Sequence, residues 1–585
     1  MRRCSTAGSS LIDVIVSIGI IALLFSAIYA VYFSLIDSIT SIESRSAASS
    51  ALQSHVERIR GLPYESVGTI GGIPAGVIAQ QESSTVGSFL FNIKTIVRNI
   101  DDPFDGTIGG APNDTAPADY KQVTLEISCL SCVRFVPLQF TTIVSPKNLE
   151  NTATTGSLFI NVFDSSGIGV SGASVRVVNA SVTPAIDLTD TTNASGSLQL
   201  VGVATSSQGY QIFVSKHGYS SQQTYPLNES SNPNPLLPDA TVVSQAVTTI
   251  SFSIDLTSRI SITTYTPTCQ PVFDQHVLLS GSKLIGSNPD ILKFSTTTTT
   301  GPSGNAMLSS LEWDTYLFSL SSTSTYDLVG MSVLNPFTIN PASDASVGFT
   351  LLPSDRPSLS VAVKDATTGL PIPHASVTLS KTGYTETIIA GRSTLSDTTW
   401  NAGSYVSQSG TIDAETTIGS LLLAQIDGAY PTSTSSWLIS ETLDFGSSSS
   451  VPVALKWSGS QPQQTSVLFQ IAVNNDNATW NFVGPTGPES YFTEPESVLN
   501  GFSGYRYARY KVFLSTTNSG VTPSVESVSI DFSGPCISDF SAFFSSLPTG
   551  AYMQTVAAPG YQTSTSSVSV PASSWQESSV ALYPL

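Results

Sequence analysis

The sequence predicts a mainly β protein in which a long N-terminal transmembrane helix and a small sheet precede a string of β-sandwich modules. Three observations support this prediction. Only 11% of the residues are charged, and Ser and Thr take the place of the missing charged residues. Together with 42 Gly and 34 Pro, they favour short strands and turns over helices. Residues 14–36 contain no charged side chain. From residue 151 onward one pattern of strands and turns recurs.

Length and charge limit the classes of protein. With 585 residues the chain is too long for one domain, so several domains are expected. Its 23 Lys and Arg stand against 42 Asp and Glu, and these basic residues are scattered singly. A nucleic-acid-binding surface needs clustered Lys and Arg. We therefore expect no nucleic acid among the partners.

The uncharged run of residues 14–36 is the first element. As a helix that rises about 1.5 Å per residue it is about 35 Å long, enough to cross a hydrocarbon core of about 30 Å. Beyond this run apolar residues recur at helical spacing as far as Ile59, so the helix should continue to about Arg60. Gly61 and Pro63 should end it there.

The residues before this run have the order of a processing signal. The stretch "MRRCSTAG" carries two Arg and ends in Gly8, and Asp13 stands fifth after that glycine. This order resembles the class III signal of type IV prepilins and pseudopilins. The resemblance implies that a prepilin peptidase cuts after Gly8, that the new amino group of Ser9 is methylated, and that Asp13 pairs with this amine when subunits pack helix to helix.

Two residues depart from that family pattern. Ser9 stands where Phe or Met is commoner, and Asp13 stands where Glu is usual. The alternative interpretation is an ordinary signal-anchor helix whose Asp13 lies at the membrane interface.

Residues 61–150 contain three runs with β-type alternation. Together with the long helix and "ERIRGLPYESV", their order resembles the minor pilins of the type IV system, in which a small sheet covers the second half of the helix. Between and beside these runs lie several acids that offer oxygen ligands for a structural calcium ion, although without the spacing of a known calcium loop. The candidates are Asp101, Asp102 and Asp105, with Asp114 and Asp119 nearby. The alternative is a solvated loop, and no other cofactor is expected.

From residue 151 three copies of one plan follow. Each has a V-x-V type strand, a Gly-rich turn, a second strand, a loop that ends in Ser-Gly or its equivalent, and strands marked by Gly and Tyr, as in "GYQIFV" and "GAYMQTV". This plan resembles the carboxypeptidase regulatory-like or transthyretin-like module, which implies an immunoglobulin-like (Ig-like) sandwich without catalytic activity.

The third copy is interrupted between about Ala390 and Gly534. The interruption holds four of the six Trp, and runs such as "VPVALKWSGS" and "YRYARYKVFLSTT" are typical of long antiparallel strands. It resembles galactose-binding-like jelly rolls. The predicted division of the chain, with the membrane span at about 14–36, is a leader at 1–8, a pilin helix at 9–60, a pilin-type β domain at 61–150, Ig-like sandwiches at 151–257, 258–355 and 356–390 plus 534–585, and an inserted jelly roll at 391–533.

Four of the five Cys lie beyond the helix. Cys129 and Cys132 form a C-x-x-C, but a zinc site needs four ligands and no second C-x-x-C or His pair accompanies them. A disulfide across a local turn is therefore predicted. Cys269 and Cys536 either pair or remain free, and the sequence leaves this open.

The aromatic residues supply the candidates for binding. Exposed rings stack on sugars and anchor protein interfaces. Trp480, beside a turn in "NNDNATWNF", and Trp400 are the predicted ligand-binding residues, whereas Trp457 and Trp437 are expected in the core. The four His fall in different segments without a nearby Cys or a G-x-S-x-G turn, so we expect no catalytic residues and no enzyme activity.

These features predict a non-catalytic type IV minor pilin at a tip or sparse position. It would cross the inner (cytoplasmic) membrane once before assembly and then lie in an extracellular pilus or on the cell surface. Its partners would be other pilin subunits and the prepilin peptidase, and its sandwiches would bind a glycan or another cell-surface ligand. One alternative is a pseudopilin of a type II-like secretion system that captures a secreted substrate. Another is a membrane-anchored carbohydrate-active enzyme, which two facing acids in one cleft of the insertion would indicate.

Overall fold

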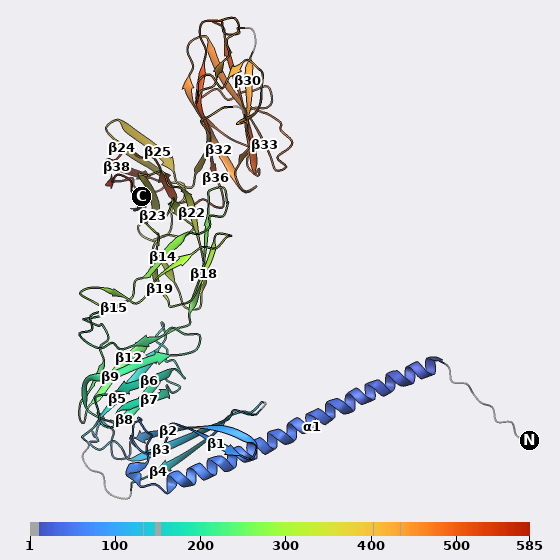
Figure 1. Ribbon diagram of the computed structural model, residues 1–585. Coiled ribbons are helices and arrows are strands. Elements are labelled where there is room, and N and C mark those ends of the chain that lie inside the picture. Colours follow the sequence, from blue (N-terminus) through green and yellow to red (C-terminus); the bar gives the residue numbers. More distant parts are fainter. Residues whose placement is uncertain (1–10, 133, 147–153, 402, 433–434) are drawn as a thin grey trace, which may run out of the picture. The chain divides into compact units, whose positions relative to one another are not determined.

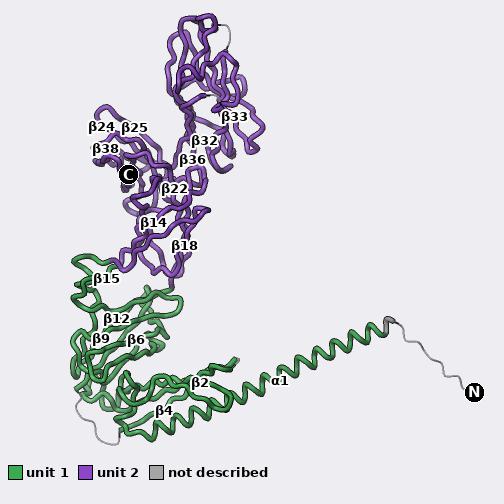
Figure 2. Tube along the Cα trace, viewed as in Figure 1, with its two compact units in different colours: residues 1–256, 284–291 green, residues 257–283, 292–585 purple. Residues whose placement is uncertain are grey.

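The computed structural model describes residues 11–132, 134–146, 154–401, 403–432 and 435–585. The described chain is mainly β, with one long N-terminal helix and many small sheets, as the sequence predicts (Figure 1). It divides into two compact units, which are residues 1–256 with 284–291 and residues 257–283 with 292–585 (Figure 2).

Helix α1 (Leu11–Arg60) begins unit 1 and ends just before Gly61. Residues 14–43 are all exposed. The last turns of the helix instead bury one stripe of side chains against a sheet, and these are Ala48, Ala51, Leu52, Val56 and Ile59. Their spacing of three and four residues places them on one face of the helix.

A four-stranded antiparallel sheet in the order β1-β2-β3-β4 packs on that stripe. A short 3-10 turn, η1 (Tyr64–Ser66), follows the helix. The strands are β1 (Gln81–Val86), β2 (Phe89–Ile100), β3 (Tyr120–Cys129) and β4 (Leu138–Val144). Alternate residues of β2 and β3 point to the helix and are buried, among them Phe91, Ile93, Val123 and Leu125.

Three β-sandwiches follow, and they share one topology. In each, the first strand pairs in parallel with the last strand of the same sandwich, namely β5 with β12, β13 with β22 and β23 with β40. In each, the second strand lies between two antiparallel neighbours, with β6 between β7 and β9, β14 between β17 and β19, and β24 between β25 and β38. The recurrent sequence pattern therefore corresponds to a recurrent topology in all three copies.

The first sandwich belongs to unit 1. One sheet holds β12 (Val247–Ser253), β5 (Gly156–Phe163) and β8 (Ser197–Val203). The other holds β10 (Gln222–Gln223), β9 (Ser206–Ser215), β6 (Ser174–Asn179) and β7 (Ile186–Thr191), with β11 (Ala240–Val242) paired to β9.

The second sandwich lies in unit 2. One sheet holds β18 (Asn305–Leu311), β13 (Ser258–Tyr265), β22 (Asp344–Pro353) and β20 (Tyr326–Met331). The other holds β17 (Ser295–Thr299), β14 (His276–Gly281), β19 (Asp314–Leu320) and β21 (Phe337–Ile339). A small separate pair is formed by β15 (Leu284–Gly286) and β16 (Ile291–Leu292).

The third sandwich, also in unit 2, takes strands from both sides of the interruption. One sheet holds β37 (Ser541–Phe544), β23 (Ser358–Asp365) and β40 (Trp575–Leu582). The other holds β25 (Tyr384–Ile389), β24 (Ser376–Lys381), β38 (Gly550–Ala557) and β39 (Ser564–Val570).

The residues between β25 and β37 form a further two-sheet sandwich, called here the inserted sandwich (residues 391–533). Its first sheet holds β26 (Ser393–Asp397), β36 (Ser524–Ser533), β32 (Val451–Ser460) and β34 (Glu496–Val498). Its second holds β27 (Tyr405–Gln408), β30 (Ser436–Ser440), β35 (Tyr507–Thr516) and β31 (Leu443–Asp444), with β33 (Thr465–Asn474) paired to β35. A small pair is formed by β28 (Ile412–Asp413) and β29 (Leu422–Leu423).

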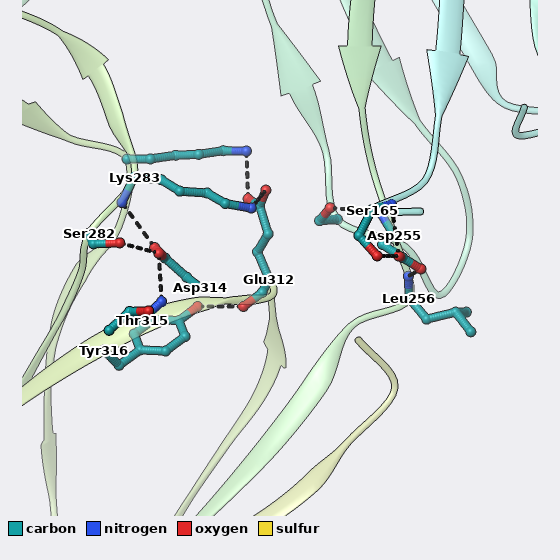
Figure 3. Close-up of polar contacts among 11 residues, drawn as sticks. Ser165, Asp255, Leu256, Ser282, Lys283, Glu312, Asp314, Thr315 and Tyr316 are labelled. Atoms are coloured by element: carbon teal, nitrogen blue, oxygen red, sulfur yellow. Dashed lines mark hydrogen bonds and ion pairs between the residues drawn. The ribbon is translucent and has the colours of Figure 1, made fainter. Parts of the chain in front are cut away.

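Each of the three Ig-like sandwiches buries one Tyr whose hydroxyl donates to a backbone carbonyl upstream in the chain. Tyr210 donates to Ala204 at 2.6 Å, and Tyr316 donates to Glu312 at 2.8 Å (the latter is drawn in Figure 3). Tyr552 donates in the same way to Pro548. This arrangement has the form of the tyrosine corner of Ig-like sandwiches. Burial raises the pKa of Tyr210 to about 12, because its ionised form would lie in an apolar core.

Buried carboxylates fix loops within each unit, as Figure 3 shows for two of them. In unit 1, Asp255 accepts hydrogen bonds from the Ser165 N–H at 3.1 Å and from the Ser165 hydroxyl at 2.6 Å. In unit 2, Asp314 accepts from the Ser282 hydroxyl at 2.6 Å and from the Thr315 N–H at 2.7 Å. Hydrogen bonds to an ionised acceptor are stronger than neutral ones, so these loops are held firmly.

Two disulfides are present. Cys129 and Cys132 are joined at the end of β3, which is the local pairing that the sequence predicts. Cys269, in the loop after β13, is joined to Cys536, which follows the last strand of the inserted sandwich. The Thr350 hydroxyl of β22 also donates to the Cys536 carbonyl at 2.7 Å. The second disulfide therefore ties the end of the insertion to the second sandwich.

Within unit 1 the small sheet is bonded directly to the first sandwich. The Arg98 guanidinium of β2 donates to both carboxylate oxygens of Asp190 in β7, at 2.7 and 2.5 Å, and Asp190 is 1% exposed. The neighbouring Asn99 side chain donates to the Val201 carbonyl of β8 at 2.9 Å. Paired, bidentate hydrogen bonds fix orientation as well as distance.

Candidate functional site

The predicted processing residues Gly8 and Ser9 lie outside the described residues. Asp13 lies in the first turns of α1, whose described side chains begin at Val14. In the described part of the chain, α1 is the one helix that is long and apolar enough to cross a membrane, with a mean hydropathy of 2.6 in its most apolar window.

The acidic loop between β2 and β3 is held by its own backbone. Asp101 accepts a hydrogen bond from the Ile108 N–H at 2.9 Å, and Asp102 accepts one from the Phe104 N–H at 3.2 Å. Burial raises the pKa of Asp101, and the other acids of the loop add to this effect. Asp105 is exposed. Among the described residues no group of three or more acids, His or Cys is arranged to hold a metal ion, so the geometry does not support the calcium prediction.

Trp400 is a core residue, contrary to the prediction that it contacts a ligand. It is 2% exposed, and its indole N–H donates to the buried Tyr510 hydroxyl at 2.9 Å. Trp457 is buried as expected, and its indole N–H donates to the Glu494 carbonyl at 3.2 Å. Trp437 is half-buried, so it does not belong to the core.

Trp480 is half-buried and lies on the outer face of the second sheet of the inserted sandwich. Strand β35 explains how this face arises, because Tyr510, Val512 and Leu514 point to the core while Arg509, Lys511 and Phe513 alternate with them and point outward. The aromatic–basic face is defined here by these three outward residues and three aromatic neighbours, Trp437, Trp480 and Tyr491.

Cations and rings alternate across this face. The Lys511 ammonium lies 4.4 Å from the ring centroid of Trp437 and 4.9 Å from that of Phe513. The Arg509 guanidinium lies 4.3 Å from the ring centroid of Trp480. Tyr491 meets Phe513 edge to face, with 5.2 Å between centroids. Since Trp437 and Phe513 are directly paired across β30 and β35, the sheet register fixes these positions.

The charge on this face is not neutralised by acids. In the described part of the chain, neither Arg509 nor Lys511 forms an ion pair with a carboxylate, although Arg509 donates to the Thr442 hydroxyl at 3.0 Å. Burial lowers the pKa of Lys511, with no acidic neighbour raising it. By contrast, Arg506 just before β35 pairs with Asp444 at 2.8 Å.

A cleft of about 540 Å³, lined by residues of the second, third and inserted sandwiches, holds two acids of the insertion. Asp531 and Glu496 both pair with the Lys456 ammonium, at 2.8 and 3.4 Å. Burial alone would lower the pKa of Lys456, but the two carboxylates outweigh it and the pKa is raised. The cleft thus holds an ion-paired cluster in which one cation bridges the two acids.

Part of this site could have been found from the sequence. The alternation in "YARYKVFLST" places Arg509, Lys511 and Phe513 on one face of a strand. The partners of these residues come from strands and loops distant in sequence, and no short motif marks them.

Comparisons with known proteins give distant likenesses only. No family model matches the chain, and no curated protein matches it. Among solved structures, the Bacillus anthracis TIE protein is similar over 86% of this chain and 73% of its own, at 11% identity and a TM-score of 0.16. The minor pilin of Streptococcus agalactiae is similar over 34% of this chain and 98% of its own, at 12% identity and a TM-score of 0.18. The shaft pilin of Lactobacillus rhamnosus GG is similar over 34% of this chain and 98% of its own, at 12% identity and a TM-score of 0.14. TM-scores this low carry no argument about fold or function.

Proposed function

We propose that this protein is a non-catalytic minor pilin of the type IV kind, anchored and assembled through α1, whose sandwiches serve adhesion. The observation that carries the proposal is the division of α1 into two parts with opposite surroundings. Residues 14–43 are exposed, whereas the last turns, from Ala48 to Ile59, are packed under the small sheet.

The exposed part of α1 needs an apolar environment. It carries large apolar side chains on every side of the helix, such as Ile15, Leu23, Phe25 and Tyr32, each more than half exposed. A helix that is apolar all round is stable only in a membrane or in the core of an assembly. A lipid bilayer would cover it first, and the helices of neighbouring subunits would replace the lipid in a fibre.

The processing step supplies the test of this proposal. The full chain is expressed together with a prepilin peptidase, and the N-terminus is read by mass spectrometry. We expect a chain that starts at methylated Ser9, because Gly8 is the small residue at the cut and Asp13 is then the fifth residue. Recovery of intact Met1 after expression with the peptidase would rule the proposal out.

A variant of the acid separates cleavage from assembly. Asp13→Ala makes the span more apolar, so insertion and cleavage after Gly8 should persist while incorporation into fibres falls, because the new amine loses its partner in the apolar core. The matched control is Asp13→Glu, which keeps the charge and should assemble at least as well as the parent. Equal assembly of the Ala and Glu variants would contradict the pairing role.

A further inference from the structure

We infer that the aromatic–basic face of the inserted sandwich binds an anionic polysaccharide, whose carboxylates pair with Arg509 and Lys511 while its sugar rings lie against the neighbouring aromatic side chains. This inference rests on the proposed adhesive role and names its ligand class. Three features of the face favour such a ligand, namely its charge, its aromatic surface and its extent along β35.

The charge of the face is unusual for its surroundings. Residues 391–533 contain only five Lys and Arg but twelve Asp and Glu. Even so, two of the five basic residues stand two positions apart on the same side of β35, and no carboxylate among the described residues pairs with either. In so acidic a domain two neighbouring uncompensated cations favour an anionic partner.

The rings do not remove this charge. A cation–π contact orients the ammonium or guanidinium over the electron-rich face of a ring but leaves its full positive charge. The Lys511 ammonium therefore stays available between the Trp437 and Phe513 rings, and the Arg509 guanidinium beside Trp480. An incoming carboxylate would find two cations already held in place by their neighbours, which lowers the entropic cost of binding.

The aromatic surface distinguishes a polysaccharide from other anions. Trp437 and Trp480 lie beside the two cations and Tyr491 packs on Phe513, and such rings offer apolar faces and edges to the C–H groups of sugars. A nucleic acid carries a far denser charge, which the net charge of −19 would repel and two cations would not compensate. Carboxylates spaced along a sugar chain match this mixture of few charges and several rings.

The aromatic–basic face also extends along β35, so that it can follow a linear polymer. Arg509 and Lys511 lie two positions apart on one strand, which is about 7 Å along β35. A polymer that runs along the strand would therefore meet the rings and both cations in succession.

Binding of two polymers that differ only in charge tests the inference. The probes are polygalacturonate and its fully methyl-esterified form, immobilised, with the full chain in detergent as the analyte. We expect binding to polygalacturonate that weakens when the salt rises from about 50 to about 500 mM, because added ions screen the pairs. We expect binding to the ester to be weaker by at least about tenfold, which is a loss of about 1.4 kcal/mol.

Variants assign the binding to the face. Arg509→Gln combined with Lys511→Gln should reduce affinity for polygalacturonate at least about tenfold, and Trp480→Leu should reduce it as well. Lys216→Gln, which removes one positive charge from the first sandwich, is the matched control and should leave affinity unchanged. Lys511→Arg keeps the charge and should retain binding, which guards against a variant that fails only because it misfolds. Unchanged thermal unfolding of each variant serves the same purpose.

Several outcomes would overturn the inference. These are no binding to polygalacturonate, equal binding of the ester, full affinity of the double variant, and equally effective competition by single-stranded DNA or polyglutamate. The assay uses the chain in detergent, so its result does not depend on cleavage after Gly8 or on fibre assembly. A failure here therefore leaves the processing test intact, and a failure of processing leaves this binding test intact.

Discussion

The hydroxyl of Tyr316 provides a direct test of how the Ig-like sandwiches are held. Tyr316 is 1% exposed, and its hydroxyl donates to the Glu312 carbonyl at 2.8 Å (Figure 3). Tyr316→Phe removes this oxygen and keeps the ring, so the change removes one part-buried hydrogen bond with little loss of packing.

The expected cost follows from the partner that remains. Loss of the donor leaves the part-buried Glu312 carbonyl without this hydrogen bond, and a polar group shielded from water and deprived of its partner costs about 1–3 kcal/mol, the lower end applying where water reaches the carbonyl. Because 1.4 kcal/mol is a factor of ten in an equilibrium constant, local opening should become about five to 150 times more frequent. Tyr583→Phe, at a position 64% exposed, should cost less than about 0.5 kcal/mol.

Hydrogen exchange measured peptide by peptide is the suitable assay, since a chain of several modules does not unfold in one two-state step. Peptides from β14 and β19 should exchange faster in Tyr316→Phe, while peptides from β5 and β9 of the first sandwich should be unchanged. Unaltered exchange of β14 and β19 would refute the reasoning, because the hydroxyl would then contribute nothing to the sandwich.

Three further predictions concern the joint in unit 1 and the inserted sandwich. Arg98→Ala should cost about 3 kcal/mol and increase hydrogen exchange in β7, because it leaves the buried Asp190 carboxylate without its cation; wild-type exchange in β7 would contradict this. The Arg506 guanidinium lowers the pKa of Asp444 in the folded protein. The pair therefore stabilises the inserted sandwich fully at pH values above the usual carboxyl pKa of about 4, and this stabilisation is lost as the pH falls through the lowered pKa of Asp444. Arg506→Gln should therefore reduce the change in thermal unfolding temperature between about pH 3 and pH 6, and a variant with the parent's profile would show that the pair is without effect. Deletion of residues 391–533 should leave the third sandwich folded, since its strands on both sides of the deletion still pair. The shortened protein should still be processed, but cells that carry it should no longer attach. If attachment persisted, the binding site would lie in the earlier sandwiches.

The fold class could be predicted because it depends on local patterns. Alternating apolar residues, Gly and Pro at turns, and an uncharged run long enough to cross a membrane are all visible in the sequence, and the structure confirms the mainly β class with one long helix. The end of α1 at Arg60 follows from the backbone limits of Gly61 and Pro63. The pairing of Cys129 with Cys132 follows from their closeness in the chain.

The candidate site was less accessible to sequence reasoning because it depends on distant contacts. Trp400 lies outside any regular strand, so no alternating pattern indicates whether its ring faces the core or the solvent. Its burial depends on Tyr510, which is 110 residues away. Likewise the pairing of Cys269 with Cys536, which lie 267 positions apart, cannot be predicted without knowing that the second sandwich and the end of the insertion are in contact. The turn beside Trp480 indicates a residue near the surface, and its role in binding stays a prediction, but its neighbour Arg509 comes from a strand beyond a long loop.

The disulfide between Cys269 and Cys536 sets the route that mechanical force takes through the chain. A pull on the inserted sandwich enters at its C-terminal end, crosses from Cys536 to Cys269, and continues along β13 toward the first sandwich. Residues 269–536 form a closed covalent loop that contains β23, β24 and β25 of the third sandwich, so these strands are bypassed by the load. In the first sandwich the load acts on β5 and β12 from opposite ends, and because these strands are parallel neighbours their hydrogen bonds are strained together in shear rather than opened one at a time. A chain connected in this way can carry tension from the inserted sandwich toward α1 while its modules remain folded.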